Sequence, residues 1–244
     1  MTLPVDSLLA EVAGLPFGSC SCTTCMPVAS RLSPDGVLAA IPDSGGFHLY
    51  DHTYDAVLND GDEILNYFID LSYGMNTLRN ANGFVDTLYH GVSHSKGEVA
   101  FIVDIFNKID PLIDLDFRQQ FTDNGSEIDI YSYNDRYMGG NVVGEAKPRG
   151  GRKFGGGGAW WEILWKDTNG RYPLSDYDKN TIVHEIGHAL GLSHPNNDPF
   201  NGNWNTDDTV MSYNISPDGW DYWFSDTDIA ALQTIWGVEN DVLV

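Results

Sequence analysis

The chain has 244 residues, of which 13 are basic and 35 acidic, so its formal charge is −22 at pH 7. A negative field of this size repels phosphate backbones and anionic membrane surfaces, which argues against nucleic-acid binding and membrane docking. Hydrophobic residues make up 42% of the sequence, close to the globular norm, which excludes wholesale disorder.

The first segment, residues 1–45, is rich in Gly, Ser, Thr and Pro and has little periodicity. We therefore expect an extended, pro-like segment ahead of a domain that covers residues 46–244. Its first residues lack the basic and apolar regions of a Sec signal. No stretch of the chain approaches the ~18 apolar residues that cross a bilayer, so we expect no membrane span.

All three cysteines, Cys20, Cys22 and Cys25, lie in this first segment. A single cluster with an odd number of cysteines is not a distributed disulfide framework. At least one thiol is therefore free, bound to a metal, or paired with another chain.

The remaining sequence predicts an α+β domain, because a strand and a helix are followed by further strands and then by two helices. Strands are predicted at 64–70, 113–118, 127–130 and 161–165, and the last three alternate as half-buried strands do. Helices are predicted from Ser95, in a capping box with Glu98, to Pro111; over 178–190; and from Ser225 to Gly237. The Gly-rich stretch 139–158 lacks the ending of a phosphate-binding loop, so we interpret it as a mobile surface loop.

One pattern carries chemistry: His184 and Glu185, then His188, Gly191 and His194. On a helix, His184 and His188 face one side, one turn apart, where two neutral imidazoles reach one zinc ion. Glu185 lies about 100° round from His184, where it reaches a water on the metal. Gly191 permits a left-handed turn, after which the chain doubles back and delivers His194 as third ligand. Three protein ligands leave a fourth position for water, as in catalytic zinc sites.

A bare His-Glu-x-x-His also occurs on ordinary amphipathic helices. The longer pattern resembles the signature of metzincin zinc metalloproteases. The run from Glu185 to His194, followed by Pro195, is most similar to the serralysin branch. This resemblance implies a zinc-dependent endopeptidase in which Glu185 is the general base.

The resemblance also implies a fold. A metzincin catalytic domain has a twisted mixed sheet with an antiparallel edge strand, an active-site helix and a C-terminal helix. Protein or peptide substrates lie extended along that edge by strand addition. Residues 161–165 occupy the expected place of the edge strand.

Two residues after the histidines take roles by resemblance. Met211 corresponds to the Met-turn, a hydrophobic base below the zinc, and Tyr213 to a tyrosine that binds zinc at rest and then stabilises the oxyanion. Taken alone, Met211 is equally a gap-filling core residue, and Tyr213 a surface phenol.

The chain departs from serralysins in lacking their calcium-binding glycine repeats. The final residues, 240–244, resemble the tail of type I secretion signals, although an arbitrary chain end would look the same. We expect an extracellular protein exported without a Sec signal. Calcium ligands remain an alternative in the loop after the motif, where ordinary turns are the other interpretation: Asp198, Asn201, Asn203, Asn205, Asp207 and Asp208.

Related metzincins are kept inactive by a pro-segment cysteine that takes the fourth zinc position. Cys25, followed by Met26 and Pro27, loosely resembles that plug, and Cys20 or Cys22 are the other candidates. The alternatives are a disulfide with a spare thiol, or a zinc knot shared with another chain.

Two further His pairs have i,i+4 spacing. His90 and His94 are candidates for a second zinc site, and His48 and His52 are interpreted as surface residues. A rival function for the whole chain is a non-catalytic peptide-binding protein with a structural or sealed zinc. The sequence does not indicate the oligomeric state.

Overall fold

The computed structural model describes residues 32–38, 63–79, 84–134, 142–149, 159–168 and 173–240. These residues belong to one compact unit, Leu32–Val244. The cysteine cluster, His48 and His52 lie outside the described residues, as does most of the C-terminal tail.

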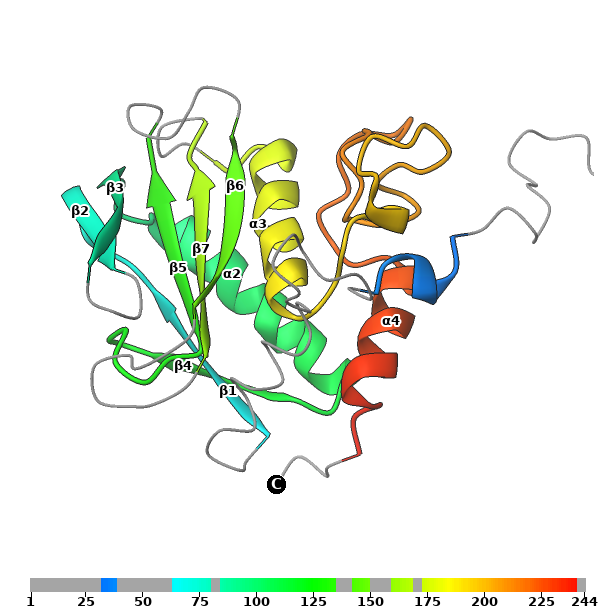
Figure 1. The fold of residues 1–244 in the computed structure, drawn as a ribbon, viewed down its shortest axis with the longest axis horizontal. Helices are drawn as coiled ribbons and strands as arrows, with labels where there is room; N and C mark the ends of the chain where they lie inside the picture. The colour runs from blue at the N-terminus through cyan, green and yellow to red at the C-terminus, as the bar shows by residue number, and fades with distance from the viewer. Residues whose placement is uncertain are drawn as a thin grey trace, which may run out of the picture. The chain divides into compact units, whose positions relative to one another are not determined.

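The described residues form one mixed seven-stranded sheet (Figure 1). Its strands are β1 (Ile64–Ile69), β2 (Gly74–Arg79), β3 (Val85–Gly91), β4 (Asp116–Gln120), β5 (Ile128–Tyr133), β6 (Gly144–Arg149) and β7 (Trp160–Lys166). Strands β4, β1, β5 and β7 are parallel, and β6 pairs antiparallel with β7. The β2–β3 hairpin joins the end of β5 through the pair of Gly91 and Tyr133. The architecture is therefore mixed α/β, and the expected mixed sheet is present.

The predicted edge strand at 161–165 is wrong. These residues lie in β7, an interior strand with β5 on one side and β6 on the other. The antiparallel edge strand is β6, inside the stretch that we interpreted as a mobile loop. Its sequence, Gly-Glu-Ala-Lys-Pro-Arg, has low strand propensity and no apolar alternation, so only pairing with β7 identifies it.

The predicted half-burial of the central strands is also wrong. All six residues of β5 are buried, and so are six of the seven in β7. The alternating polar residues are not exposed to water, because they form hydrogen bonds and ion pairs within the protein. Asp129 accepts a hydrogen bond from Ser126, and Glu162 pairs with Arg149 of β6 at 2.6 Å. The strand predicted at 113–118 is displaced to β4, and Ile113 is buried ahead of it.

In the described part of the chain, three α-helices accompany the sheet: α2 (Lys96–Ile109), α3 (Asp176–Ala189) and α4 (Asp226–Trp236). Short 3-10 turns occur at Pro34–Gly36, Asp110–Leu112 and Pro195–Asn197. Ser95 and Glu98 make both bonds of the predicted capping box at the start of α2. Among the described residues, no helix is long and apolar enough to cross a membrane.

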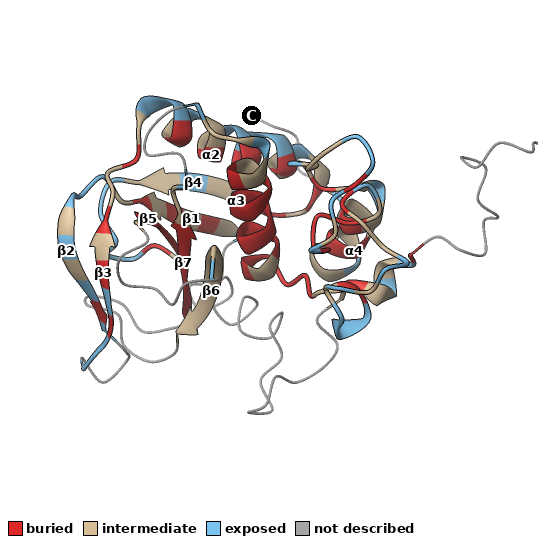
Figure 2. Ribbon diagram, turned by 90° about the horizontal axis from the view of Figure 1, so that it is seen from above, coloured by how far each residue is buried: buried red, intermediate tan, exposed pale blue. Residues whose placement is uncertain are grey.

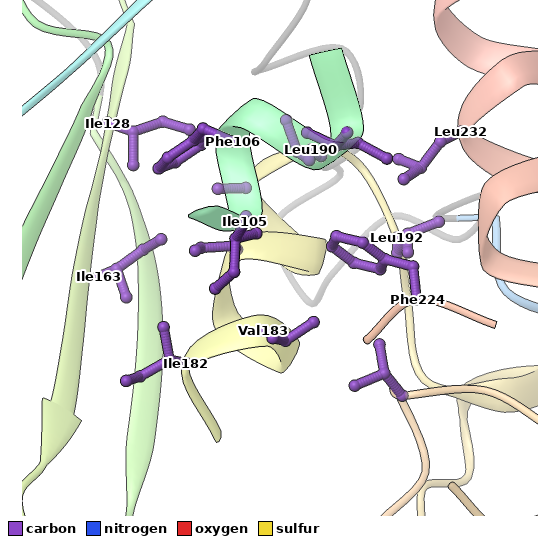
Figure 3. Close-up of a cluster of buried hydrophobic side chains, with 14 of the residues drawn as sticks. Ile105, Phe106, Ile128, Ile163, Ile182, Val183, Leu190, Leu192, Phe224 and Leu232 are labelled. Atoms are coloured by element: carbon purple, nitrogen blue, oxygen red, sulfur yellow. The ribbon is translucent and has the colours of Figure 1, made fainter. Parts of the chain in front are cut away.

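The main core lies between the sheet and these helices (Figure 3). The picture labels Ile128 and Ile163 from the sheet, Ile105 and Phe106 from α2, Ile182 and Val183 from α3, and Leu232 from α4. Full burial of such a side chain contributes about 1.5–3 kcal/mol. Ten of the fourteen residues of α3 are buried, which makes it an interior helix (Figure 2). Leu32 and Val37 also join this core, so the packed unit includes residues from the segment that we predicted as pro-like.

The pair of His90 and His94 does not form a second zinc site. The indole Nε1 of Trp165 donates to His94 Nε2 at 2.9 Å, and His94 Nδ1 donates to the Asp70 carbonyl at 2.5 Å. Both nitrogens of the buried imidazole are therefore used. His90 Nδ1 lies 3.2 Å from the amide of Asn134 instead.

This arrangement predicts a pH dependence of stability. Burial lowers the pKa of His94, against the opposing charges of Asp70 and Asp167, so His94 is neutral when folded. The stabilisation is full above the unfolded pKa near ~6.5 and is lost as pH falls below it. The amide of His94→Gln replaces both hydrogen bonds but does not titrate. When the pH falls from 7 to 5.5, we therefore expect the free energy of unfolding to fall by about 1 kcal/mol less in this variant than in wild type. Urea unfolding at both pH values checks this, and equal losses would contradict it.

Candidate metal centre and active site

The end of α3 turns the chain back on itself. Gly191 adopts φ 102, its N–H donates to the His188 carbonyl at 3.0 Å, and the Leu192 N–H donates to the Gly187 carbonyl at 2.8 Å. These bonds form a Schellman motif, which requires a residue that accepts the left-handed conformation. The following strand-like segment is fixed by the Ser193 N–H, which donates to the Val37 carbonyl at 2.8 Å. The chain therefore brings His194 back toward α3, as the sequence predicted.

Three imidazoles meet at this point. The Nε2 atoms of His184 and His194 lie 3.3 Å apart, and one ligand nitrogen from each of His184, His188 and His194 lies within 4.8 Å of the others. Two nitrogens bound tetrahedrally to zinc at ~2.0–2.1 Å would lie about 3.3 Å apart. In the described part of the chain, this is the only group of three or more His, Cys, Asp or Glu with metal-binding spacing.

Backbone carbonyls orient two of the imidazoles. His184 Nδ1 donates to the Val210 carbonyl at 3.0 Å, and His188 Nδ1 donates to the Leu192 carbonyl at 2.9 Å. Because these acceptors require a proton on Nδ1, the lone pairs are on Nε2, toward the centre of the triad.

The triad is neutral at physiological pH. Burial lowers the pKa of His184 well below its ordinary value, with further contributions from His188 and His194. Burial also lowers the pKa of His188 and, with His188 beside it, lowers that of His194 to about 3. Neutral imidazole is the form that binds zinc, so the donor set fits this ion.

The side chain of Glu185 extends from α3 to the edge strand β6. Its carboxylate accepts a hydrogen bond from the Ala146 N–H. A methyl group built on Gly144 would lie 2.3 Å from Glu185 Oε1, so only glycine leaves room for the carboxylate. Burial, with the nearby charge of Glu145, raises the pKa of Glu185 to about 8. A divalent cation at the triad would favour the ionised form.

Met211 packs against α3, and Tyr213 lies next to the triad. Met211 is fully buried, and its sulfur lies beside Gly187 of α3. The Tyr213 ring lies 5.3 Å from that of His184 and 5.0 Å from that of His194. Burial, with the Glu185 charge nearby, raises the pKa of the Tyr213 phenol. It is therefore a neutral hydrogen-bond donor near the triad.

Asp228, which we did not single out from the sequence, supports this site. It is fully buried, and its carboxylate accepts hydrogen bonds from the Thr209 hydroxyl at 2.6 Å and the Val210 N–H at 2.9 Å. The Val210 carbonyl in turn holds His184. Asp228 also completes a capping box with Ser225 at the start of α4, and this Ser-x-x-Asp pattern was the available signal.

Asp228→Asn should therefore weaken both the fold and the metal site. An amide cannot accept all the hydrogen bonds that the carboxylate accepts, so we expect the free energy of unfolding to be about 2–3 kcal/mol lower than in wild type. Zinc affinity should fall about 10-fold, because the support of His184 is loosened. Urea unfolding and zinc competition measure these changes. The matched control is Asp226→Asn, an exposed acid in the same helical turn, which should change neither.

The acidic loop after the motif is organised by turns. Asp198, Asn201 and Asn205 each accept the backbone N–H two residues ahead, at 2.8–3.2 Å. Asp208 accepts the Asn205 N–H at 3.0 Å. These side chains make Asx turns, which is the ordinary-turn interpretation of the loop.

Comparison with known proteins gives partial matches, and no protein-family model matches the chain. Metallopeptidase AprA of Pseudomonas marginalis is 32% identical over 92 residues, which are 35% of this chain and 17% of that protein. Serralysin C of Dickeya chrysanthemi is 37% identical over 92 residues, covering 37% of this chain and 16% of that protein. Serralysin G of the same organism is 35% identical over 97 residues, 33% of this chain and 20% of that protein. The matched region thus spans only a fifth or less of these relatives. Over about a third of its length, the chain is similar to serralysin-type metalloproteases.

Proposed function

We propose that the protein is a zinc-dependent endopeptidase of serralysin-like, metzincin type. The observation that carries the proposal is the 3.3 Å approach of the Nε2 atoms of His184 and His194 within the triad, and Glu185 follows His184 directly on α3. The partial similarity to serralysins supports the same class of enzyme.

His184, His188 and His194 would hold the ion. A zinc ion bound there supplies a Lewis acid and lowers the pKa of water to near ~7. Glu185 would take a proton from the attacking water and return it to the leaving amine. The Tyr213 phenol would donate a hydrogen bond to the developing oxyanion, and Met211 would pack below the triad.

The substrate would be a protein or peptide in extended form. Glu185, the proposed general base, contacts Gly144 and Ala146 of the edge strand β6. A chain added to this edge would therefore pass next to the triad. As for serralysin-type enzymes, we propose an extracellular location, with type I-like export as one route.

We also propose that the protein is made as a zymogen blocked by a cysteine of the N-terminal segment, in which case residues 1–45 contain the inhibitory part and 46–244 form the catalytic domain, in whose core Leu32 and Val37 also pack. Cys25, Cys22 and Cys20 are the candidates, and all lie outside the described residues. Replacing all three with Ser should raise the initial cleavage rate of the intact chain. An unchanged initial rate in the Ser variant would end the cysteine-switch hypothesis.

The peptidase proposal is tested by metal removal and return. We expect the purified chain to cleave reduced, carboxymethylated protein with zinc, to stop after chelation, and to resume with one equivalent of zinc. Mass spectrometry of the fragments measures cleavage. The rival non-catalytic function would be favoured if the zinc-loaded protein bound peptides without cleaving them and its triple Ser variant, which lacks the proposed block, also left them uncleaved.

A further inference from the structure

Strand β6 presents fewer backbone hydrogen-bonding groups at the edge of the sheet than an ordinary strand does. The hydrogen bonds between β6 and β7 show which groups these are. The Lys166 N–H of β7 donates to the Val143 carbonyl at 2.8 Å, just ahead of β6. In an antiparallel pair, successive residues alternate between facing the partner and facing away. The backbone N–H and C=O groups of residues 145, 147 and 149 therefore point toward β7. Those of the residues between them point outward, away from the sheet.

The other side of β7 gives the same assignment independently. The Trp161 N–H donates to the Glu127 carbonyl at 2.7 Å, toward β5. Trp161 is the register partner of Pro148. Because the Trp161 groups point away from β6, Pro148 has no bonding partner on β7 and faces outward.

The outward-facing residues are thus Gly144, Ala146 and Pro148. They present three carbonyl acceptors but only two N–H donors, because proline has none. One of the two donors, the Ala146 N–H, is directed at Glu185. The edge is therefore rich in acceptors and poor in donors.

The side chains that point to the other face fix this strand in place. Arg149 pairs with Glu162 of β7 at 2.6 Å and with Asp86 of β3. Lys147 Nζ donates to the Thr87 hydroxyl of β3 at 3.1 Å. Strand β6 is therefore held on two strands, and its outward groups are preorganised.

We propose that Pro148 makes this edge poor in donors for the extended substrate of the proposed function, so that β6 binds an antiparallel chain chiefly through the substrate's N–H groups and leaves the substrate carbonyl opposite Pro148 without a donor. This inference deepens the proposed peptidase function and rests on it. Glu185 contacts Gly144 and Ala146, so the scissile bond lies near them and Pro148 lies toward the amino side of the substrate. The preferred substrates are extended peptides with free N–H groups at the two alternate positions opposite Ala146 and Pro148.

The first test scans a substrate for these N–H groups. Wild-type protein is given oxidised insulin B chain, and a ten-residue peptide around the main cleavage site is made with single N-methyl groups. We expect kcat/KM to fall about 10-fold for the two alternate residues on the amino side and little for the residue between them. Equal sensitivity at consecutive positions, or none, would overturn the inference. Sensitivity on the carboxyl side only would mean a parallel substrate, which also overturns it.

The second test restores the missing donor. Pro148→Ala should raise kcat/KM about 5-fold for peptides that keep the residue opposite position 148, and should have no effect on peptides truncated before it. The matched control is Pro111→Ala, which makes the same substitution at an exposed proline after α2 and leaves the outward groups of β6 and their anchors intact. An equal gain for long and truncated peptides would contradict the proposal. The N-methyl scan uses wild type, so the proposal stays testable if Pro148→Ala does not fold.

A binding measurement separates this inference from the peptidase function. Overlapping labelled ten-residue peptides of oxidised insulin B chain are titrated into the zinc-loaded Glu185→Gln variant and followed by fluorescence anisotropy, and the peptide that binds most tightly is made again with single N-methyl groups. An alternating loss of affinity without cleavage by wild type supports β6 pairing and removes the peptidase. Cleavage that depends on Glu185 but shows no alternation overturns the pairing and keeps the peptidase. Neither binding nor cleavage overturns both.

Discussion

Glu185→Gln is expected to lower kcat/KM for peptide cleavage by about 10³-fold or more while leaving zinc bound. The carboxylate contacts the edge strand, belongs to the residue that directly follows His184 of the triad, and is able to exchange a proton there. The amide has nearly the same shape and still accepts the Ala146 N–H, but it cannot take a proton from water. Steady-state kinetics and metal analysis of the purified variant measure both quantities.

The control for this variant is Glu145→Gln, a partly exposed neighbour that forms an ion pair with Lys147 at 3.2 Å. It removes a negative charge near the site without removing the base, so its activity should stay within a few-fold of wild type. If Glu185→Gln cleaved peptides at the wild-type rate, the assignment of Glu185 as general base would be wrong.

His188→Ala is expected to abolish stable zinc binding and, with it, peptide cleavage. The remaining nitrogens of His184 and His194 lie 3.3 Å apart and would supply only two protein ligands. Loss of a hydrogen-bond partner behind a ligand already costs about 10–100-fold in affinity, and loss of the ligand itself should cost more. Competition with a chromophoric chelator measures the dissociation constant.

His90→Ala is the matched control, because it removes an imidazole of the same i,i+4 spacing that contacts Asn134 instead of the triad. Its zinc affinity and activity should equal those of wild type. Wild-type zinc affinity in His188→Ala would mean that the ion is held elsewhere.

The cluster of three histidines could be predicted because its determinants are local. His184 and His188 share a helix face by helical periodicity alone, and Gly191 sits where the left-handed turn is needed. The capped start of α2 was predicted for the same reason, because a cap joins residues three positions apart, and the caps of α3 and α4, which we did not predict, carry the same local signal. The roles of Met211 and Tyr213 came from family resemblance and remain proposals. The structure places Met211 against α3 and the Tyr213 ring beside the triad.

The edge strand could not be predicted, because its signal is in its partner. The six residues of β6 carry no alternation of their own and become a strand through β7, whose residues 161–165 we took for the edge. The same limit applies to Glu162, whose burial depends on Arg149 thirteen residues away.

The sequence by itself thus determined the clustering of the three histidines, the position of Glu185 beside them in the chain and the turn that brings His194 back, since each follows from bonds and periodicity within a few residues. Only the tertiary structure decided which strand borders the site, which backbone groups that strand presents, and that Asp228 supports His184 through Val210. These features depend on contacts between distant segments, whose pairing is selected by the burial and hydrogen bonding of the whole fold.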